Sequence, residues 1–328
     1  MLLIAFLTLL TLLGLLTFSR FAYFGKFLYV INNSVEIRMA KLFKEQISTT
    51  TDTFIYLTNN QITKPTMLLL HGFSADKTIW LKFARHAGKD FNLIIPDLLG
   101  HGDIPYSTQQ NYSAFTQAKY VRRFIYAIGL KGSITIVGNS MGGMIGAILN
   151  SNIQGNDQVL STQNSQPDAD SYFNTSVTIE NLVLIDPAGA KSEFAMQNIA
   201  LCTSHFIHRT TQESFDFYKF VMHKPPFMPP SVLAYISQTN YLQKQQQYQH
   251  MFADFFNPSE FFDKAMQSRC KKVLLIWGEQ DQLLPVQESS HWQKLLPCET
   301  YILPYIGHMP MVECPAITYS FIKSTTSQ

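Results

Sequence analysis

Short apolar runs recur along most of the chain and alternate with stretches that carry apolar residues at helical spacing. Seven runs have the length and aliphatic or β-branched content of strands, at residues 54–57, 67–70, 93–96, 134–138, 182–186, 273–277 and 300–303. Helical patterns lie around residues 80–87, 112–128 and 141–149. This alternation predicts a mainly parallel sheet that is covered by helices on both faces.

Two long segments break the alternation. Residues 154–176 are rich in Asn, Gln, Ser and Asp and have little to bury, which predicts a solvated loop. From 188 to 264 strand patterns are absent and prolines interrupt any long helix, which predicts a helical cap over the carboxyl ends of the strands. We therefore expect an anchor and linker over 1–50, a core formed by 51–187 and 265–328, and the cap over 188–264.

The beginning of the sequence has a pattern of its own. Residues 2–18 are 17 uncharged, mostly aliphatic positions, which as a helix would extend about 26 Å and nearly cross the roughly 30 Å hydrocarbon layer of a membrane. Aromatic residues interleaved with Lys26 follow, as at a membrane interface. We expect an uncleaved single-pass anchor. The alternatives are a cleaved signal peptide, although no small-residue cleavage site follows, and a buried core helix.

Charge and cysteine content bear on location and partners. Basic residues follow the apolar segment, so the positive-inside tendency places the globular part in the cytoplasm. Cleavage of a signal would instead make the protein secreted or periplasmic. The four cysteines fit either free thiols or up to two disulfides and do not decide between these compartments. A net charge of +2 without a basic run gives no support for nucleic-acid binding, and protein partners stay unknown.

The strand pattern at 134–138 leads into Gly-Asn-Ser-Met-Gly-Gly, which has the form G-x-S-x-G. This form is typical of a strained turn between a strand and a helix, where side chains two positions either side of the serine would collide. Ser140 is therefore a candidate nucleophile, and the amide of Met141 points to where an oxyanion would form. A phosphate-binding turn, or a tight turn without function, is the alternative.

A serine nucleophile needs a histidine as general base, which is itself oriented by an acid. Where the serine is carried on such a turn, the acid and then the histidine follow it along the chain. Only His291 and His308 lie after the predicted cap. His291 falls within a helical pattern, whereas His308 lies in a turn that leaves the last strand, so we predict His308 as the base.

Three carboxyl groups are candidates for the acid. Asp281 lies in the loop after the penultimate strand, where its side chain can reach a histidine that follows the last strand. Asp186 ends the preceding strand and is the positional rival, and Glu279 lies nearer the strand end than Asp281. We favour Asp281 and keep the other two as alternatives.

The second oxyanion donor is expected from the loop after an early strand. The loop that follows 67–70 supplies the amide of Phe73 as the predicted donor, with His71 and Gly72 shaping the turn. Asp97 and His101 lie in the loop after the next strand. We expect Asp97 to fix that loop through backbone hydrogen bonds and His101 to line it, and we assign no catalytic role to either.

Together these motifs resemble the α/β-hydrolase superfamily from about residue 51 to 324: H-G-F, P-D-L-L-G-H-G, G-N-S-M-G-G, D-P-A-G, W-G-E-Q-D-Q and G-H-M-P-M-V-E. Within it the chain is similar to membrane-anchored monoacylglycerol lipases, through residues 71–77 with Trp80 and the apolar start. It also resembles cold-adapted bacterial triacylglycerol lipases, through residues 217–227.

The resemblance implies an α/β fold, the α/β-hydrolase fold, with a mainly parallel sheet flanked by helices and an inserted helical cap. It also implies a lipase or esterase in which Ser140, Asp281 and His308 form the triad. Phe73 and Met141 would then supply the oxyanion hole.

The expected function is hydrolysis of lipid carboxylic esters, with acylglycerols first among them, through an acyl-enzyme and without a metal or organic cofactor. The cap offers apolar surface for an acyl chain, and the candidate substrate-binding residues are Phe217, Phe220, Met222 and Phe227. Two alternatives stay open. One is carbon–carbon bond hydrolysis of ring-cleavage products, which G-N-S-M-G-G also resembles, and the other is a ligand-binding protein of the same fold without catalysis.

Overall fold

The computed structural model describes residues 2–151 and 169–326. Its centre is an eight-stranded sheet in the order β1-β2-β4-β3-β5-β6-β7-β8. β2 is antiparallel to its neighbours β1 and β4, and all other neighbours are parallel. The strands are β1 (Phe43–Ser48), β2 (Thr53–Thr58), β3 (Thr66–Leu70), β4 (Asn92–Pro96), β5 (Gly132–Asn139), β6 (Val177–Ile185), β7 (Lys272–Gly278) and β8 (Glu299–Leu303). The predicted mainly parallel sheet is confirmed.

The strand that sequence reasoning missed is β1. All seven predicted runs are strands of the sheet, whereas Phe43–Ser48 is an edge strand with mostly exposed side chains. In its sequence, Phe-Lys-Glu-Gln-Ile-Ser, Glu45 separates the two apolar residues, so the regular alternation that would indicate a strand is missing. Because β1 lies within residues 1–50, the sheet begins inside the segment that was expected to be only anchor and linker.

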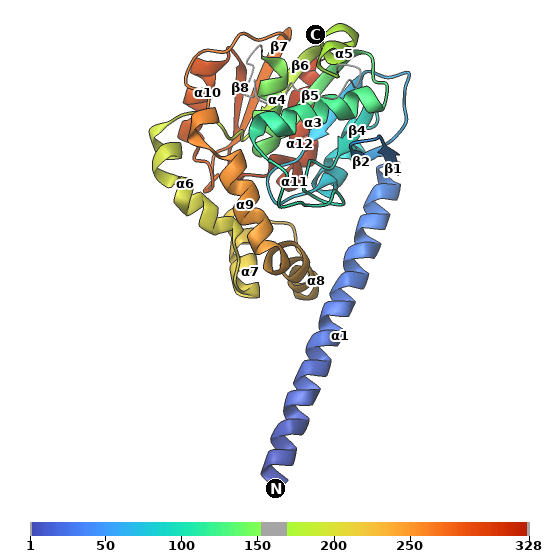
Figure 1. Ribbon diagram of the computed structural model, residues 1–328, viewed down its shortest axis with the longest axis vertical. Helices are drawn as coiled ribbons and strands as arrows, with labels where there is room; N and C mark the ends of the chain where they lie inside the picture. The colour runs from blue at the N-terminus through green and yellow to red at the C-terminus, as the bar shows by residue number, and fades with distance from the viewer. Residues whose placement is uncertain (1, 152–168, 327–328) are drawn as a thin grey trace.

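Helices cover both faces of the sheet (Figure 1). Successive residues of a strand point to opposite faces. In β5, Ile136 accordingly belongs to a hydrophobic cluster with residues of α3 and α4, whereas Val137 belongs to a cluster with residues of α2 and α12. These helices are α2 (Leu81–Ala87), α3 (Ala114–Ala127), α4 (Met141–Asn150) and α12 (Pro315–Thr326). The first three confirm the predicted helices, and α12 was not anticipated.

Between β6 and β7 the described chain adds helices and no strand to the sheet. They are α6 (Glu193–Phe206), α7 (Thr211–Phe220), α8 (Pro230–Ile236), a π-helical turn (Ser237–Tyr241), α9 (Gln245–Phe255) and two short 3₁₀ turns (Leu242–Lys244 and Pro258–Glu260). The two ends of this segment meet, because Ala190 pairs with Phe262 and the Phe262 amide donates to the Gly189 carbonyl at 2.8 Å. Such a closed entry and exit is what an inserted cap requires.

The N-terminal helix is longer than its apolar segment. α1 (Leu2–Met39) has 38 residues, and its first half extends away from the rest of the molecule (Figure 1). Its second half packs against α8, and Glu36 forms an ion pair with Arg85 of α2 at 2.9 Å. Within the described residues no helix has both the length and the apolar content needed to cross a membrane. The predicted membrane-spanning anchor at residues 2–18 is therefore not confirmed.

The polar segment that was expected to be a solvated loop is partly helical. α5 (Ala169–Ser176) lies at its end, with Phe173 buried and the Arg122 guanidinium 5.5 Å from the ring centroid. The prediction was wrong here because a single buried aromatic residue gives no helical periodicity. The remainder, up to residue 168, lies outside the described residues.

Three of the four cysteines, Cys270, Cys298 and Cys314, are free thiols. Burial raises the pKa of each of these thiols above its ordinary value. Thiols held in the neutral form are poor nucleophiles, so these three are packing residues rather than candidates for chemistry.

Candidate active site

The turn at Ser140 has the strained backbone that the G-x-S-x-G form predicts. Ser140 lies between β5 and α4 with φ of 53° and ψ of −115°, a left-handed conformation that residues other than glycine rarely adopt. A Cβ at Gly138 would overlap the carbonyl of Gly142, and a Cβ at Gly142 would overlap the carbonyl of Leu70. The two glycines therefore permit the sharp turn that presents the serine at the carboxyl ends of the strands.

His308 and Asp281 form a hydrogen-bonded pair at the same edge of the sheet. His308 follows β8 and Asp281 follows β7, and His308 Nδ1 donates to Asp281 Oδ2 at 2.6 Å. The amides of Leu283 and Leu284 donate to Asp281 Oδ1 at 2.8 and 2.9 Å. Three N–H donors stabilise the ionised carboxylate. With Nδ1 as the donor, Nε2 is left as the acceptor that a general base needs.

The other candidates for acid and base lie in different surroundings. Asp186 accepts a hydrogen bond from the amide of Gly278 at 2.8 Å, and not one from the imidazole of His308. Glu279 is bonded to the side chain that follows it, outside the site. His291 lies on α10 (Ser289–Leu295), as its helical pattern predicts. The structure thus pairs the predicted base with the favoured acid, and Ser140 and His308 line the same cavity.

Two side chains that sequence reasoning did not single out hold these loops. Asn139 Nδ2 donates to the carbonyls of Ile185 at 3.2 Å and of His308 at 3.1 Å, which joins the ends of β5 and β6 to the histidine loop. Glu313, in α11 (Pro310–Glu313), accepts the amide of Gly307 at 2.9 Å. Asn139 immediately precedes the nucleophile, so its position was a signal that could have been used.

Two backbone amides next to the nucleophile are unused. Gly72 lies against Ser140, since a Cβ on this glycine would be 3.3 Å from the serine Cβ. Neither the amide of Phe73, which follows it, nor that of Met141 donates a hydrogen bond within the described residues. Unused amides beside a nucleophile are the donors that an oxyanion hole needs.

The loop that carries Phe73 is held by a buried imidazole. His71 Nε2 accepts the amide N–H of Leu98 at 3.0 Å, so Nδ1 carries the proton and donates to the Gly72 carbonyl at 2.8 Å. Burial lowers the pKa of His71, which keeps the ring neutral and allows it to accept and donate at once. His71 therefore shapes the turn, as predicted.

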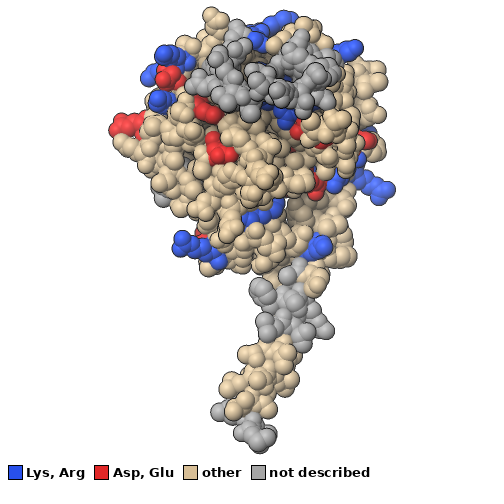
Figure 2. Space-filling view, viewed as in Figure 1, with Lys and Arg blue, Asp and Glu red and all other residues tan. Residues whose placement is uncertain are grey.

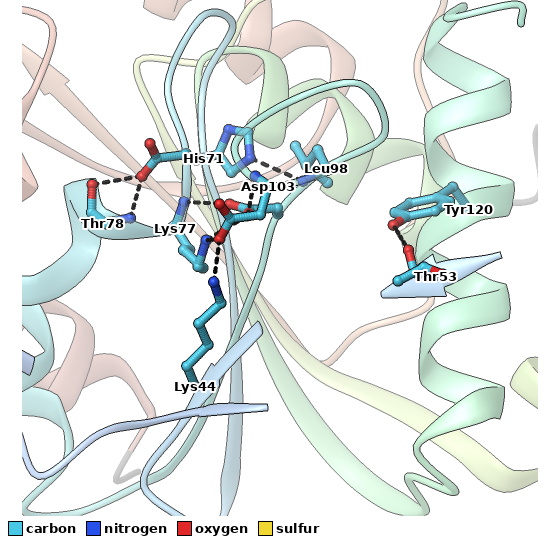
Figure 3. A network of polar contacts seen from close by, with 10 residues as sticks. Lys44, Thr53, His71, Lys77, Thr78, Leu98, Asp103 and Tyr120 are labelled. Carbon is cyan, nitrogen blue, oxygen red and sulfur yellow. Dashed lines mark hydrogen bonds and ion pairs between the residues drawn. The ribbon is translucent and has the colours of Figure 1, made fainter. Parts of the chain in front are cut away.

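Asp97 organises the neighbouring loop through backbone bonds, as predicted. Its carboxylate accepts the amides of Lys77 at 3.0 Å and Asp103 at 2.9 Å. The sequence did not single out Lys77, whose Nζ lies 2.5 Å from Asp97 and 2.7 Å from Asp103, while Lys44 lies on the outer side of Asp103 at 2.8 Å (Figure 3). Burial acts to lower the pKa of Lys77, but the carboxylates outweigh it and raise the pKa. The ammonium therefore stays charged.

Ser140 and His308 open onto one cavity of about 620 Å³. Of the four predicted substrate-binding residues, Phe217, Met222 and Phe227 line this cavity. Phe220 does not line it, because its ring stacks on His205 with the centroids 4.4 Å apart. The sequence of the cap could not predict which phenylalanines line the cavity, since both faces of α7 carry aromatic residues.

The second half of α1 forms part of the cavity wall. Leu28, Ile31 and Val35 line the cavity together with Val232 and Leu233 of α8. The sequence predicted this region as the interfacial end of an anchor and did not connect it with the site. Contact between α1 and the cap depends on long-range packing, which no local pattern in the sequence reveals.

Comparison with known proteins identifies the family. The sequence profile of the alpha/beta hydrolase fold matches residues 65–315, and the chain belongs to this family. It is similar to Lipase 1 of Psychrobacter immobilis, with 26% identity over 266 residues that cover 80% of this chain and 77% of the lipase. It is also similar to monoacylglycerol lipase ABHD6 of Homo sapiens, with 24% identity over 273 residues that cover 79% and 74%.

Among solved structures, the chain resembles that of a membrane phospholipase A, described as a bacterial virulence factor. The TM-score is 0.77 at 25% sequence identity, and the match covers 98% of this chain and 97% of the other. The likeness therefore extends over the sheet, the segment between β6 and β7 and most of α1.

Proposed function

We propose that this protein is a serine hydrolase that cleaves carboxylic esters of lipids, with acylglycerols as the first substrates to test. One observation carries the proposal: Ser140 on its strained turn and His308 bonded to Asp281 open onto a single large cavity. The lipases among the relatives support the choice of lipid esters.

In this mechanism Ser140 Oγ attacks the ester carbonyl while His308 Nε2 takes the hydroxyl proton, and Asp281 stabilises the resulting imidazolium. The amides of Phe73 and Met141 donate to the oxyanion, and one such donor contributes about 3 to 4 kcal/mol. The proton passes to the leaving alcohol. Water then attacks the acyl-enzyme with His308 as base, which releases the fatty acid and restores the serine.

The apolar lining of the cavity favours substrates with medium or long acyl chains over acetate esters. Phe217, Met222 and Val232 are apolar, and each methylene transferred from water to such a surface contributes about 0.8 kcal/mol. An acyl chain that continues along α1 would meet Ile31 and Val35. A monoacylglycerol carries one acyl chain and is less bulky at its glycerol end than a triacylglycerol. We therefore expect monoacylglycerols to be the preferred substrates.

We further propose that the first half of α1 attaches the enzyme to a membrane, with the catalytic part on the cytoplasmic side. Ile4, Phe6, Leu9 and Leu12 are each more than half exposed, and residues 4–14 carry no charged side chain (Figure 2). Apolar surface exposed to this extent indicates an apolar partner. Replacement of Leu9 and Leu12 by serine should release the protein from sedimented membranes. If the variant stays bound after a high-salt wash, another surface is the attachment site.

Hydrolysis of acetyl, octanoyl and monooleoyl esters tests the proposed activity. We expect kcat/KM to rise with chain length until the cavity is full, and Ser140→Ala and His308→Ala to abolish turnover in folded protein. A steady fall with chain length would leave a small-ester hydrolase. Turnover of ring-cleavage products without turnover of esters would favour carbon–carbon hydrolysis, and lipid binding without any turnover would favour a ligand-binding protein.

A further inference from the structure

A second buried carboxyl group, that of Asp186, lies next to the pair formed by His308 and Asp281 and has no part in the mechanism above. Asp186 follows β6 with a left-handed φ of 42°. Its side chain is completely buried, and Oδ1 accepts the amide N–H of Gly278 at 2.8 Å. Within the described residues Oδ2 has no N–H or O–H group bonded to it. A lone ionised oxygen there would be costly, because buried polar atoms are almost always hydrogen-bonded.

The neighbour of this carboxyl is Asp281. One side-chain N or O atom each from Asp186, Asp281 and His308 lies within 4.8 Å of the other two. Two carboxylates in one buried site do not both ionise, because like charges repel strongly where water is excluded. Asp281 is the ionised member, since its two oxygens accept N–H groups from Leu283, Leu284 and His308. Asp186 accepts only one and is the neutral member.

Burial and the nearby acidic groups raise the pKa of Asp186, whereas the hydrogen bond from the Gly278 amide acts to lower it. Burial raises the pKa of Asp186 well above its ordinary value, and the charge of Asp281 adds to the rise. Glu313 contributes further negative charge, and burial holds the neighbouring Cys314 thiol neutral by raising its pKa.

We infer that Asp186 is a positioning residue that carries a proton on Oδ2 and donates it in a hydrogen bond to the carboxylate of Asp281. The inference rests on the proposed function, because Asp281 acts only through His308. The bond gives Asp281 a fourth donor, which restrains rotation of the carboxylate and keeps Oδ2 of Asp281 aimed at the imidazole. A neutral Asp186 also places no second negative charge beside the base, where it would favour the protonated, inactive imidazole.

The variants Asp186→Asn and Asp186→Leu separate a neutral donor from a carboxylate. Asparagine has the shape of protonated aspartic acid: its oxygen can accept from Gly278 and its amide can donate to Asp281. Leucine has similar size and offers neither group. We expect Asp186→Asn to keep kcat within about three-fold of wild type, and Asp186→Leu to lower kcat about ten-fold or more with little change in KM for the octanoyl ester.

The pH profile distinguishes a neutral from an ionised Asp186. The acid limb of kcat/KM reports ionisation of the base in the free enzyme. We expect this limb to have the same midpoint in wild type and Asp186→Asn, because neither carries a charge at this position. A shift of the midpoint to lower pH by about one unit or more would mean that the substitution removed a negative charge, and would overturn the inference.

An infrared difference spectrum tests the proton directly and does not depend on activity. The spectrum of wild type minus that of Asp186→Asn, both folded by circular dichroism, should contain the C=O band of a protonated carboxyl group that moves in heavy water. If Asp186→Asn does not fold, Asp186→Leu serves as the reference. A carboxylate band in place of the carboxyl band would contradict the assignment.

Failure of the proposed function can be told apart from failure of this inference. Retained ester hydrolysis in Ser140→Ala would refute the triad without touching the infrared result. The compact group of Asp186, Asp281 and His308 could also hold a cation instead of a proton. We expect EDTA to leave wild-type activity unchanged, and a loss of activity that added Zn²⁺ restores would overturn the proton assignment.

Discussion

Replacement of Gly25 by alanine is expected to open the cavity wall that α1 and α8 form together. An added Cβ would lie against the backbone carbonyl group of Ser231, 2.5 Å from its carbon atom, where ordinary contacts are 3.4 to 4 Å. The obstacle is backbone, so it cannot turn aside as a flexible side chain would. The two helices must therefore separate by about 1 Å.

The size of the effect follows from the wall that moves. α8 contributes Val232, Leu233 and Ile236 to the cavity, and α1 contributes Ile31 and Val35. Separation that admits water along two or three methylenes of an acyl chain costs about 2 kcal/mol, or about thirty-fold in kcat/KM. An acetyl group is too short to reach this wall, so its kcat/KM should change by less than about two-fold. Overpacking also lowers the free energy of unfolding by about 1 to 3 kcal/mol.

The assay compares kcat/KM for octanoyl and acetyl esters in the same detergent solution. Gly14→Ala is the matched control, because it lies on the same helix and an added Cβ meets no heavy atom within 4 Å. We expect the octanoyl-to-acetyl ratio to fall in Gly25→Ala and to stay at the wild-type value in Gly14→Ala. An unchanged ratio in folded Gly25→Ala would refute the idea that contact between α1 and α8 shapes the acyl site.

Other parts of the site give further predictions. Lys77→Met leaves the buried carboxylate of Asp97 without its ion-pair partner and should lower the free energy of unfolding in urea by about 3 to 5 kcal/mol; a loss below about 1 kcal/mol would mean the pair is solvated. Burial lowers the pKa of His71 and His101 from 6.5. Below that pH both imidazoles take up protons when the protein unfolds. The stability that the neutral rings contribute is therefore present above about pH 6.5 and is lost as the pH falls below it. A melting temperature measured from pH 7.5 to 5.5 should therefore fall, and a constant value would contradict their burial as neutral rings. Asp281→Asn should reduce kcat by about 10⁴, whereas a milder effect than that of Asp186→Asn would move the acid to the earlier strand.

The core strands and the candidate chemistry could be predicted because each has a local signal. Strands that are mostly buried, such as β5, appear as apolar runs, and a strained turn around a serine requires glycines at fixed positions. The order of the acid and histidine along the chain then left few candidates. The position of Asp281 beside His308 followed because both lie in loops at the carboxyl edge of a parallel sheet.

What could not be predicted depends on contacts between distant segments. β1 is mostly exposed and has no regular apolar alternation, and the role of Lys77 depends on a loop twenty residues away. Phe217 and Phe220 lie on the same short helix, and only the packing of the cap decides which one faces the cavity. The same is true of α1, whose apolar start indicated a membrane while its second half lines the cavity.

Mass spectrometry after reaction with a long-chain fluorophosphonate tests the central claim most directly. This reagent phosphonylates a serine only when a neighbouring base and an oxyanion site activate it. We predict one phosphonyl group per chain, located on the peptide that contains Ser140, and no label in His308→Ala. Label on a different residue, or an unlabelled wild-type protein that is folded, would contradict the account.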